Sequence, residues 1–138
     1  MITQTQTTSF KEELYEGIHD LLTDTIMIAL YTAEADLDAN TTVYSASHEV
    51  TGTGYVAGGN VLLGATVQSS GNTAFVSFNN TSWPAASFTC RGALIYNSSK
   101  ANRSIAVLNF GSDRTVTNNT FTVTFPANTA DSAIIRMV

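Results

Sequence analysis

An amphipathic pattern with helical spacing runs through residues 10–22. Apolar residues recur there every three or four positions, and charged residues fill the opposite face. Ser9 precedes Glu12 by three residues, the spacing of a capping box, and acidic residues crowd the first turn, where the helix dipole favours them. The pattern therefore predicts one amphipathic helix over residues 10–22. Its apolar positions are Phe10, Leu14, Ile18, Leu21 and Leu22.

After Asp24 the hydrophobic pattern changes to a period of two, interrupted by short turns rich in Gly, Ser and Asn. Residues 26–31 are apolar at nearly every position, which predicts a strand buried on both faces. Short strands at such spacings favour a mainly β fold, an antiparallel β-sandwich or jelly-roll-like domain with one N-terminal amphipathic helix. Further extended segments are expected at residues 43–44, 55–56, 61–67, 73–78, 88–96, 104–110, 120–125 and 133–138.

The first eight residues are polar and rich in Thr and Gln. Because they offer little apolar surface to bury, we expect residues 1–8 to form a flexible N-terminal arm. Residues 9–138 are then expected to form a single domain, and a chain of 138 residues is long enough to build a core without disulfides or metals.

Composition narrows the class of protein. Charged residues make up 12% of the chain, about half the usual share, and Thr, Ser and Asn together make up about a third. Such surfaces are common in β-rich extracellular and virion proteins. The net charge of −5 argues against nucleic acid as a partner, because phosphate binding needs a basic face. Nine of the eleven acidic residues lie in residues 1–50, whereas five of the six Lys and Arg follow residue 50. This asymmetry suits a protein that meets copies of itself or a charged neighbour.

The candidate chemical sites are incomplete. His48 and Glu49 lie near two serines, but no Gly-x-Ser-x-Gly motif accompanies them. Asp36-x-Asp38-x-Asn40 has the first spacings of a calcium loop, yet Thr41 stands where the loop needs Gly, and Ser47 stands at the twelfth position, where it needs Glu. Weak binding of a cation by this acidic loop stays an open alternative, and a solvated loop is the default interpretation. The sequence therefore predicts no catalytic residue, no metal site and no cofactor, and we expect no enzymatic activity.

Three further observations bear on location. The single cysteine, Cys90, excludes a disulfide framework. The first residues contain neither a basic residue nor the apolar core of a secretory signal, so synthesis in a host cytoplasm is expected. No apolar run approaches the length of a membrane span, so no membrane partner is expected.

Several motifs together resemble a group of small structural proteins of tailed bacteriophages. In that group an N-terminal helix leads into a strand with the sequence ALYT, then an acidic loop, and then a Gly-rich segment. This chain carries ALYT at residues 29–32, the acidic loop around Asp36, and E-x-x-GTGY-x-AGG at residues 49–59. Similar later features are Trp83, A-x-IYN at residues 93–97, L-x-FG at residues 108–111 and F-x-V-x-F at residues 121–125. The resemblance covers roughly residues 9–138.

The resemblance implies a non-enzymatic virion structural protein. Within that class we expect a capsid decoration (cement) protein on the capsid surface, which bridges and stabilises subunits of the major capsid protein. Its partners are then the major capsid protein and itself, as a homo-oligomer that is expected to be a trimer. Two alternatives stay open: a tail adaptor or fibre-associated subunit that binds a glycan or receptor, and a secreted carbohydrate-binding module.

The expected contact residues come from three parts of the chain. The arm supplies polar side chains, the acidic loop supplies charge, and the aromatic residues supply apolar contact area. The residues expected to contact a partner are Thr3, Thr5, Thr7, Thr8, Asp36, Asp38, Tyr55 and Trp83.

Overall fold

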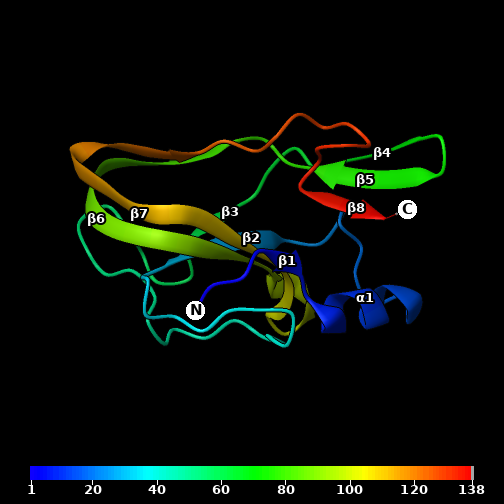
Figure 1. The fold of residues 1–138 in the computed structure, drawn as a ribbon, viewed down its shortest axis with the longest axis horizontal. Helices are drawn as coiled ribbons and strands as arrows, with labels where there is room; N and C mark the ends of the chain where they lie inside the picture. Colours follow the sequence, from blue (N-terminus) through cyan, green and yellow to red (C-terminus); the bar gives the residue numbers. More distant parts are fainter. Residues whose placement is uncertain (138) are drawn as a thin grey trace.

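Two antiparallel β-layers face each other across a hydrophobic core, as Figure 1 shows for the computed structural model, which describes residues 1–137. The fold is mainly β, as the sequence predicts, and is consistent with a β-sandwich. The larger sheet has the order β1-β7-β6-β2-β3 and the smaller one the order β4-β5-β8. The elements are β1 (Thr5–Gln6), α1 (Thr8–Tyr15), β2 (Ile26–Tyr31), β3 (Asn60–Val61), β4 (Thr66–Ser70), β5 (Thr73–Ser77), β6 (Thr81–Asn97), a 3₁₀ turn (Ser98–Lys100), β7 (Arg103–Val123) and β8 (Ile135–Met137).

The long β6–β7 ribbon links the two layers. Its inner half lies in the large sheet, and it bends at the left of Figure 1 so that its outer half continues over the other layer. The bend coincides with register shifts: between the pairs Gly92–Asn109 and Cys90–Arg114, β6 advances two residues and β7 advances five. The extra residues form a bulge, which bends a strand and increases its twist. The sequence pattern predicted shorter separate strands at 88–96, 104–110 and 120–125.

The large sheet is buried on both faces. Its inner face packs against the second layer, and its outer face is covered by Ile2 and by the loop that follows β2. The predicted two-sided burial of residues 26–31 is confirmed, since five of the six residues of β2 are buried. The second cluster, on the outer face, contains Ile2, Ala29, Tyr31, Ala35, Leu37, Leu94, Tyr96 and Val107.

The helix is shorter than its periodicity predicts. It spans Thr8–Tyr15 instead of residues 10–22, and its N-cap is Thr7, whose hydroxyl accepts the Phe10 N–H, instead of Ser9. The helix ends because Gly17 takes a φ of 71°, in the left-handed region that stops helices. Residues 16–25 form turns, and the apolar Leu21 still reaches the core.

The expected flexible arm is also wrong. Residues 5 and 6 form β1, which pairs antiparallel with β7, and Ile2 forms a parallel bridge with Leu37. The physical reason is that Ile2 packs on the outer face of the large sheet, β1 extends that sheet at its edge beside β7, and Thr7 is buried. Residues 1–8 are therefore part of the fold.

The remaining differences concern short elements. The expected extended stretch 61–67 is divided at Gly64, whose φ is 69°, into β3 and β4. The expected strands at 43–44 and 55–56 are loops, with one isolated bridge between Val43 and Arg103. Among the helices of residues 1–137, none is long and apolar enough to cross a membrane.

Candidate functional site

Two of the regions expected to contact a partner lie side by side. The main chain of residues 2–8 runs along the acidic loop, with hydrogen bonds from Thr3 N to Leu37 O (2.8 Å) and from Thr8 N to Ala39 O (2.9 Å). Thr3, Thr8, Asp36 and Asp38 are exposed, whereas Thr5 is half-buried in β1 and Thr7 is buried under the helix. Four of the eight expected contact residues thus lie on exposed neighbouring segments. We call Thr3, Thr8, Asp36 and Asp38 the acidic-loop surface.

Asp38 acts within its own loop. One of its side-chain oxygens accepts the Asn40 N–H at 2.8 Å, an Asx-turn arrangement, and its own N–H donates to the Thr41 hydroxyl. Among the described residues no group of three or more Asp, Glu, His or Cys is placed to hold a metal ion. The loop conformation is therefore explained by hydrogen bonds within the loop and to the N-terminal segment.

Glu49 is the centre of a hydrogen-bond network under the Gly-rich loop. Although its side chain is acidic, only 8% of the residue is exposed. Its carboxylate accepts hydrogen bonds from the Tyr44 hydroxyl (2.6 Å), the Tyr55 hydroxyl (2.5 Å) and the Gly58 N–H (2.8 Å). The Tyr55 hydroxyl also accepts the Leu30 N–H at 2.9 Å, which joins the network to β2. These contacts explain why Glu49 and the Gly-rich segment occur together in the sequence: the carboxylate anchors the loop.

The network raises the pKa values of its tyrosines. Burial is the largest cause of the raised pKa values of Tyr44 and Tyr55. The hydrogen bond to the Glu49 carboxylate raises them further, because ionising either tyrosine would place a second negative charge beside that carboxylate. The pKa of Tyr31 is raised by burial and then by the charge of Glu49. All three values lie above the ordinary tyrosine value of about 10.

This arrangement predicts loss of stability at alkaline pH. Because the pKa of Tyr55 is raised on folding, its contribution is complete below pH ~10, the unfolded value, and is lost as pH rises further. We expect the free energy of unfolding, measured by urea denaturation, to fall steadily above pH ~10. Tyr55→Phe should lower it by about 1–3 kcal/mol at pH 7, since the buried Leu30 N–H loses its acceptor, and should flatten the alkaline decline. A wild-type protein equally stable at pH 8 and at pH ~11 would contradict the network.

The expected aromatic contact surface is wrong, because its members are in the core. Trp83 is 2% exposed, and its ring lies 6.1 Å from that of Tyr55 and 6.0 Å from that of Phe121. Tyr96 is buried and stacks on Tyr44 with the ring centroids 4.7 Å apart. The ribbon bend turns the aromatic side chains inward between the layers. Tyr55 and Trp83 are thus brought together, but as packing residues.

A second polar network lies at the end of the large sheet near α1. His19, whose side chain is fully buried, has one ring nitrogen 2.8 Å from Glu13 and the other 3.0 Å from the Asn97 amide. The Asn97 amide also donates to Asp24, which pairs with Lys100 at 2.9 Å. Burial opposes ionisation of Asp24, but hydrogen bonds from Asn97 and Lys100 outweigh it and lower its pKa to about 2. Both ring nitrogens are thus occupied, which leaves His19 no free nitrogen to act as a base. The predicted helix over residues 10–22 includes His19, and its periodicity did not reveal this role.

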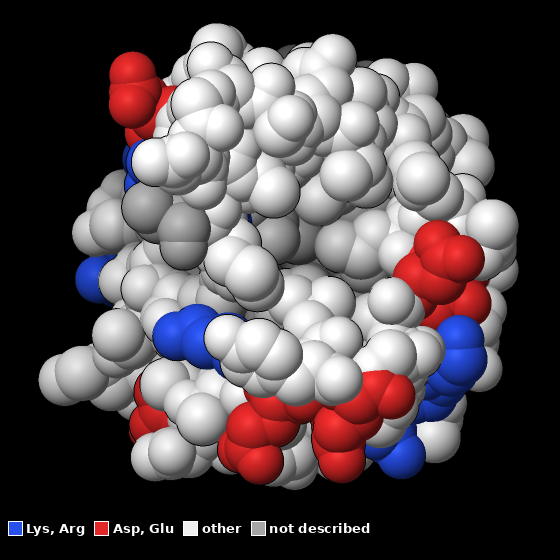
Figure 2. All heavy atoms as spheres, turned by 90° about the vertical axis from the view of Figure 1, so that its right-hand side faces the viewer, with Lys and Arg blue, Asp and Glu red and all other residues white. Residues whose placement is uncertain are grey.

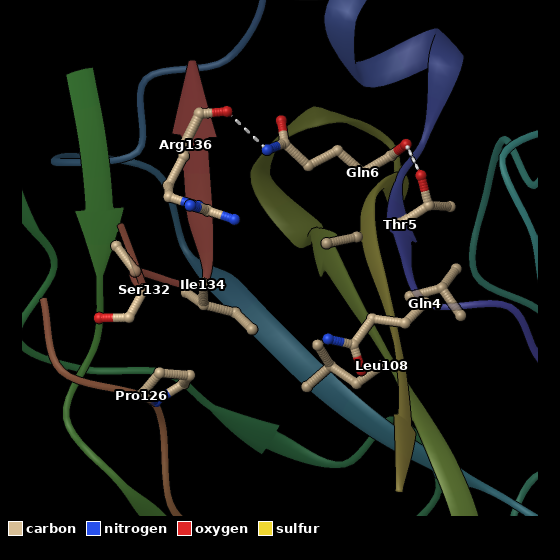
Figure 3. A pocket seen from close by; sticks show the side chains of 11 residues that line it. Gln4, Thr5, Gln6, Leu108, Pro126, Ser132, Ile134 and Arg136 are labelled. Atoms are coloured by element: carbon tan, nitrogen blue, oxygen red, sulfur yellow. Dashed lines mark hydrogen bonds between the residues drawn. The ribbon is translucent and has the colours of Figure 1, made fainter. Parts of the chain in front are cut away.

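A polar cavity of about 260 Å³ separates the facing edges of the two sheets (Figure 3). From β1 the Gln6 side chain reaches across and donates to the main-chain oxygen of Arg136 in β8, at 2.8 Å. Pro126 and Ile134 line the side nearer β8, and Leu108 of β7 lines the other. The Gln6 amide therefore occupies a main-chain acceptor on the edge of β8. Thr5, one of the expected contact residues, also lines this cavity.

One surface was missed by the sequence reasoning. No Lys, Arg, His, Asp or Glu occurs between Val50 and Cys90, or between Thr115 and Ala130. These segments form β4, β5 and the outer halves of β6 and β7. Figure 2, which faces the end with α1, shows acidic side chains along the lower margin and a broad area without charged side chains above. We call the exposed residues of this layer the uncharged face: Thr66, Val67, Gln68, Ser69, Ser70, Ala74, Ser82, Thr89, Thr115, Thr120 and Thr122. The long gap between charges in the sequence is the signal that could have revealed it.

Comparison with known proteins found no matching family model, no similar curated protein and no similar solved structure.

Proposed function

We propose that this chain is a non-enzymatic structural subunit of a tailed-bacteriophage virion, a decoration protein on the capsid surface that binds the major capsid protein. The observation that carries the proposal is the acidic-loop surface. There the N-terminal segment and the acidic loop are hydrogen-bonded into one exposed region, which carries Asp38 and Asp36, the latter paired with the Met1 ammonium. The motif resemblance supplies the virion setting.

The polar groups best suited to chemistry support a structural role. Both carboxylate oxygens of Glu49 accept hydrogen bonds from the chain's own loop, and both nitrogens of His19 are engaged. Burial raises the pKa of the Cys90 thiol to about 12, so it stays protonated and is a poor nucleophile at neutral pH. Glu49 and His19 each hold one segment to another, and Cys90 packs in the core.

Capsid attachment would proceed by docking of preformed surfaces. Because residues 2–8 are already ordered, binding requires little additional loss of chain entropy. Asp36 and Asp38 would meet basic residues of the shell, which steers association and makes it sensitive to salt. By spanning a seam between two capsid subunits, one decoration subunit would then oppose their separation.

A tail subunit that binds a glycan is the second candidate, and one pocket favours it. Phe110 and Phe121, with ring centroids 6.2 Å apart, line a shallow cavity of about 330 Å³ together with Arg114. Aromatic faces beside a polar donor suit a sugar ring. The burial of Trp83 removes one of the two aromatic residues expected to contact a partner.

Sedimentation of the purified protein with capsids that lack it tests the proposal. We expect saturable binding at a fixed number of copies per capsid, which weakens at high salt. The double variant Asp36→Asn/Asp38→Asn should bind at least about tenfold more weakly. Glu12→Gln/Glu16→Gln is the matched control, because it removes the same charge from exposed positions of the α1 region and should bind as the wild type does.

Absence of binding to the capsids would contradict the proposal. Equal weakening by both double variants would show that net charge matters and the acidic-loop surface does not. Binding of soluble glycans that is lost in Phe121→Ala, with no binding to capsids, would favour the tail subunit.

A further inference from the structure

The smaller sheet has one closed edge and one open edge. On the β8 side, the Gln6 amide already donates to the Arg136 oxygen across the cavity. On the other side β4 pairs only with β5, and no other strand of residues 1–137 pairs with it. An unpaired edge leaves main-chain donors and acceptors available to a strand from another molecule.

β4 also lacks the features that normally prevent edge pairing. All five residues, Thr66–Ser70, are exposed, and they include no charged residue and no proline. The pairing of β4 with β5 runs without a register shift, so no bulge turns the edge away. Exposed edge strands of natural proteins are usually protected by Lys, Pro or a bulge. The absence of these features from β4 indicates an edge that pairs with a strand of another molecule.

Exposed apolar side chains line two neighbouring cavities, one of which includes a residue of β4. Val67, 48% exposed, lines an apolar cavity of about 140 Å³ that reaches Leu21. Leu21 also lines the neighbouring cavity, of about 220 Å³, together with Leu22 and Leu63, which are 61% and 66% exposed. Side chains of this size are rarely left in water together on a monomer, and such patches mark interaction surfaces.

The charge distribution indicates that the partner of the β4 edge is a second copy of this chain. The chain carries a net charge of −5, so two copies repel each other unless they meet where charges are absent. β4 is the edge strand of the layer that carries the uncharged face, and the core of an interface is characteristically depleted of charged residues. An antiparallel pair of β4 strands about a two-fold axis at Gln68 places Thr66 opposite Ser70, and Val67 opposite Ser69, with no like charges facing each other.

We propose that β4 is a self-association edge: two copies pair their β4 strands antiparallel, which joins their small sheets into one six-stranded sheet in the order β8-β5-β4-β4-β5-β8. The exposed apolar side chains of the two neighbouring cavities then become covered by the second copy. Because the β4–β4 contact is two-fold and occupies the β4 edge of both copies, the assembly stops at two copies. The proposal gives a two-fold contact in place of the trimer expected from the sequence, and it does not depend on capsid binding.

Sedimentation equilibrium of the full chain tests the proposal. We expect a reversible monomer–dimer equilibrium with a dissociation constant in the micromolar range, about what a small interface supports. Gln68→Lys places two positive charges opposite each other at the axis and should weaken the dimer at least about tenfold. Thr120→Lys, at an exposed position of β7 in the same layer, is the matched control and should leave the equilibrium unchanged.

A cross-link provides a second readout that needs no disruption of the dimer. Residues opposite each other in an antiparallel pair lie about 4.5–5.5 Å apart at Cα, within the range of a disulfide. Gln68→Cys should therefore form a disulfide-linked dimer on mild oxidation, whereas Thr120→Cys should not; the native Cys90 is buried. A monomer at all concentrations, a trimer, a dimer unaffected by Gln68→Lys, or no cross-link through position 68 would each overturn the proposal.

Discussion

Replacing Gly59 with alanine should destabilise the protein more than any other single-methyl addition in the Gly-rich segment. Gly59 has a φ of 82°, and a Cβ built on it would lie 1.8 Å from the Ile28 oxygen. That oxygen belongs to the main chain of β2, which is paired with β6 and β3 in the large sheet, so it cannot move aside as a flexible side chain could. We expect a loss of about 3–5 kcal/mol in the free energy of unfolding, in the range seen when backbone strain and overpacking combine.

Gly71→Ala is the matched control for that variant. Gly71 also has a positive φ, 58°, but no atom lies within 4 Å of its would-be Cβ. Gly71→Ala should therefore lower the free energy of unfolding only by the cost of placing alanine in a left-handed conformation, about 1–2 kcal/mol. Urea denaturation of both variants measures the difference. Equal losses would show that the close approach of the loop to β2 is not a determinant of stability.

Removing residues 2–7 should give the second large effect. The deletion exposes the outer face of the large sheet where Ile2 packs, removes β1, and leaves α1 without its N-cap Thr7. Burial of an isoleucine and a helix cap together account for about 3–4 kcal/mol, before the strand hydrogen bonds are counted. We expect the melting temperature to fall by roughly 10 °C or more.

Point variants separate the contributions within that segment. Ile2→Ala should lose about 2–4 kcal/mol and Thr7→Ala about 1–2 kcal/mol, whereas Thr3→Ala, at an exposed position, should change little. Thermal melts followed by circular dichroism provide the measurement. If the deletion variant has the same melting temperature as the wild type, residues 2–7 do not contribute to the fold, and the flexible arm predicted from the composition is favoured.

The sequence predicted what depends on local pattern. Two-sided burial of β2 follows from its continuous apolar residues, and a β fold follows from the short strands and their turns. The helix was placed correctly in the N-terminal region but extended too far, because Leu21 continues the apolar spacing although Gly17 ends the helix. Periodicity alone does not distinguish a helix from a turn that also reaches the core.

The candidate site depended on contacts between distant segments, which the pattern does not contain. The polar composition of residues 1–8 suggested an arm, but pairing with β7, about a hundred residues away in the chain, orders them. Trp83 was expected to contact a partner, but it packs beside Tyr55 and Phe121 in the core. Glu49 was noted only as part of a motif, because its two tyrosine partners become neighbours only when the loop folds.

Image reconstruction of capsids decorated with the purified protein tests the central claim most directly. The account predicts density of the size of this chain at regular positions over the head, with the side that carries Asp36 and Asp38 against the shell. Density confined to the tail, or a decorated head in which that side faces the solvent, would contradict it.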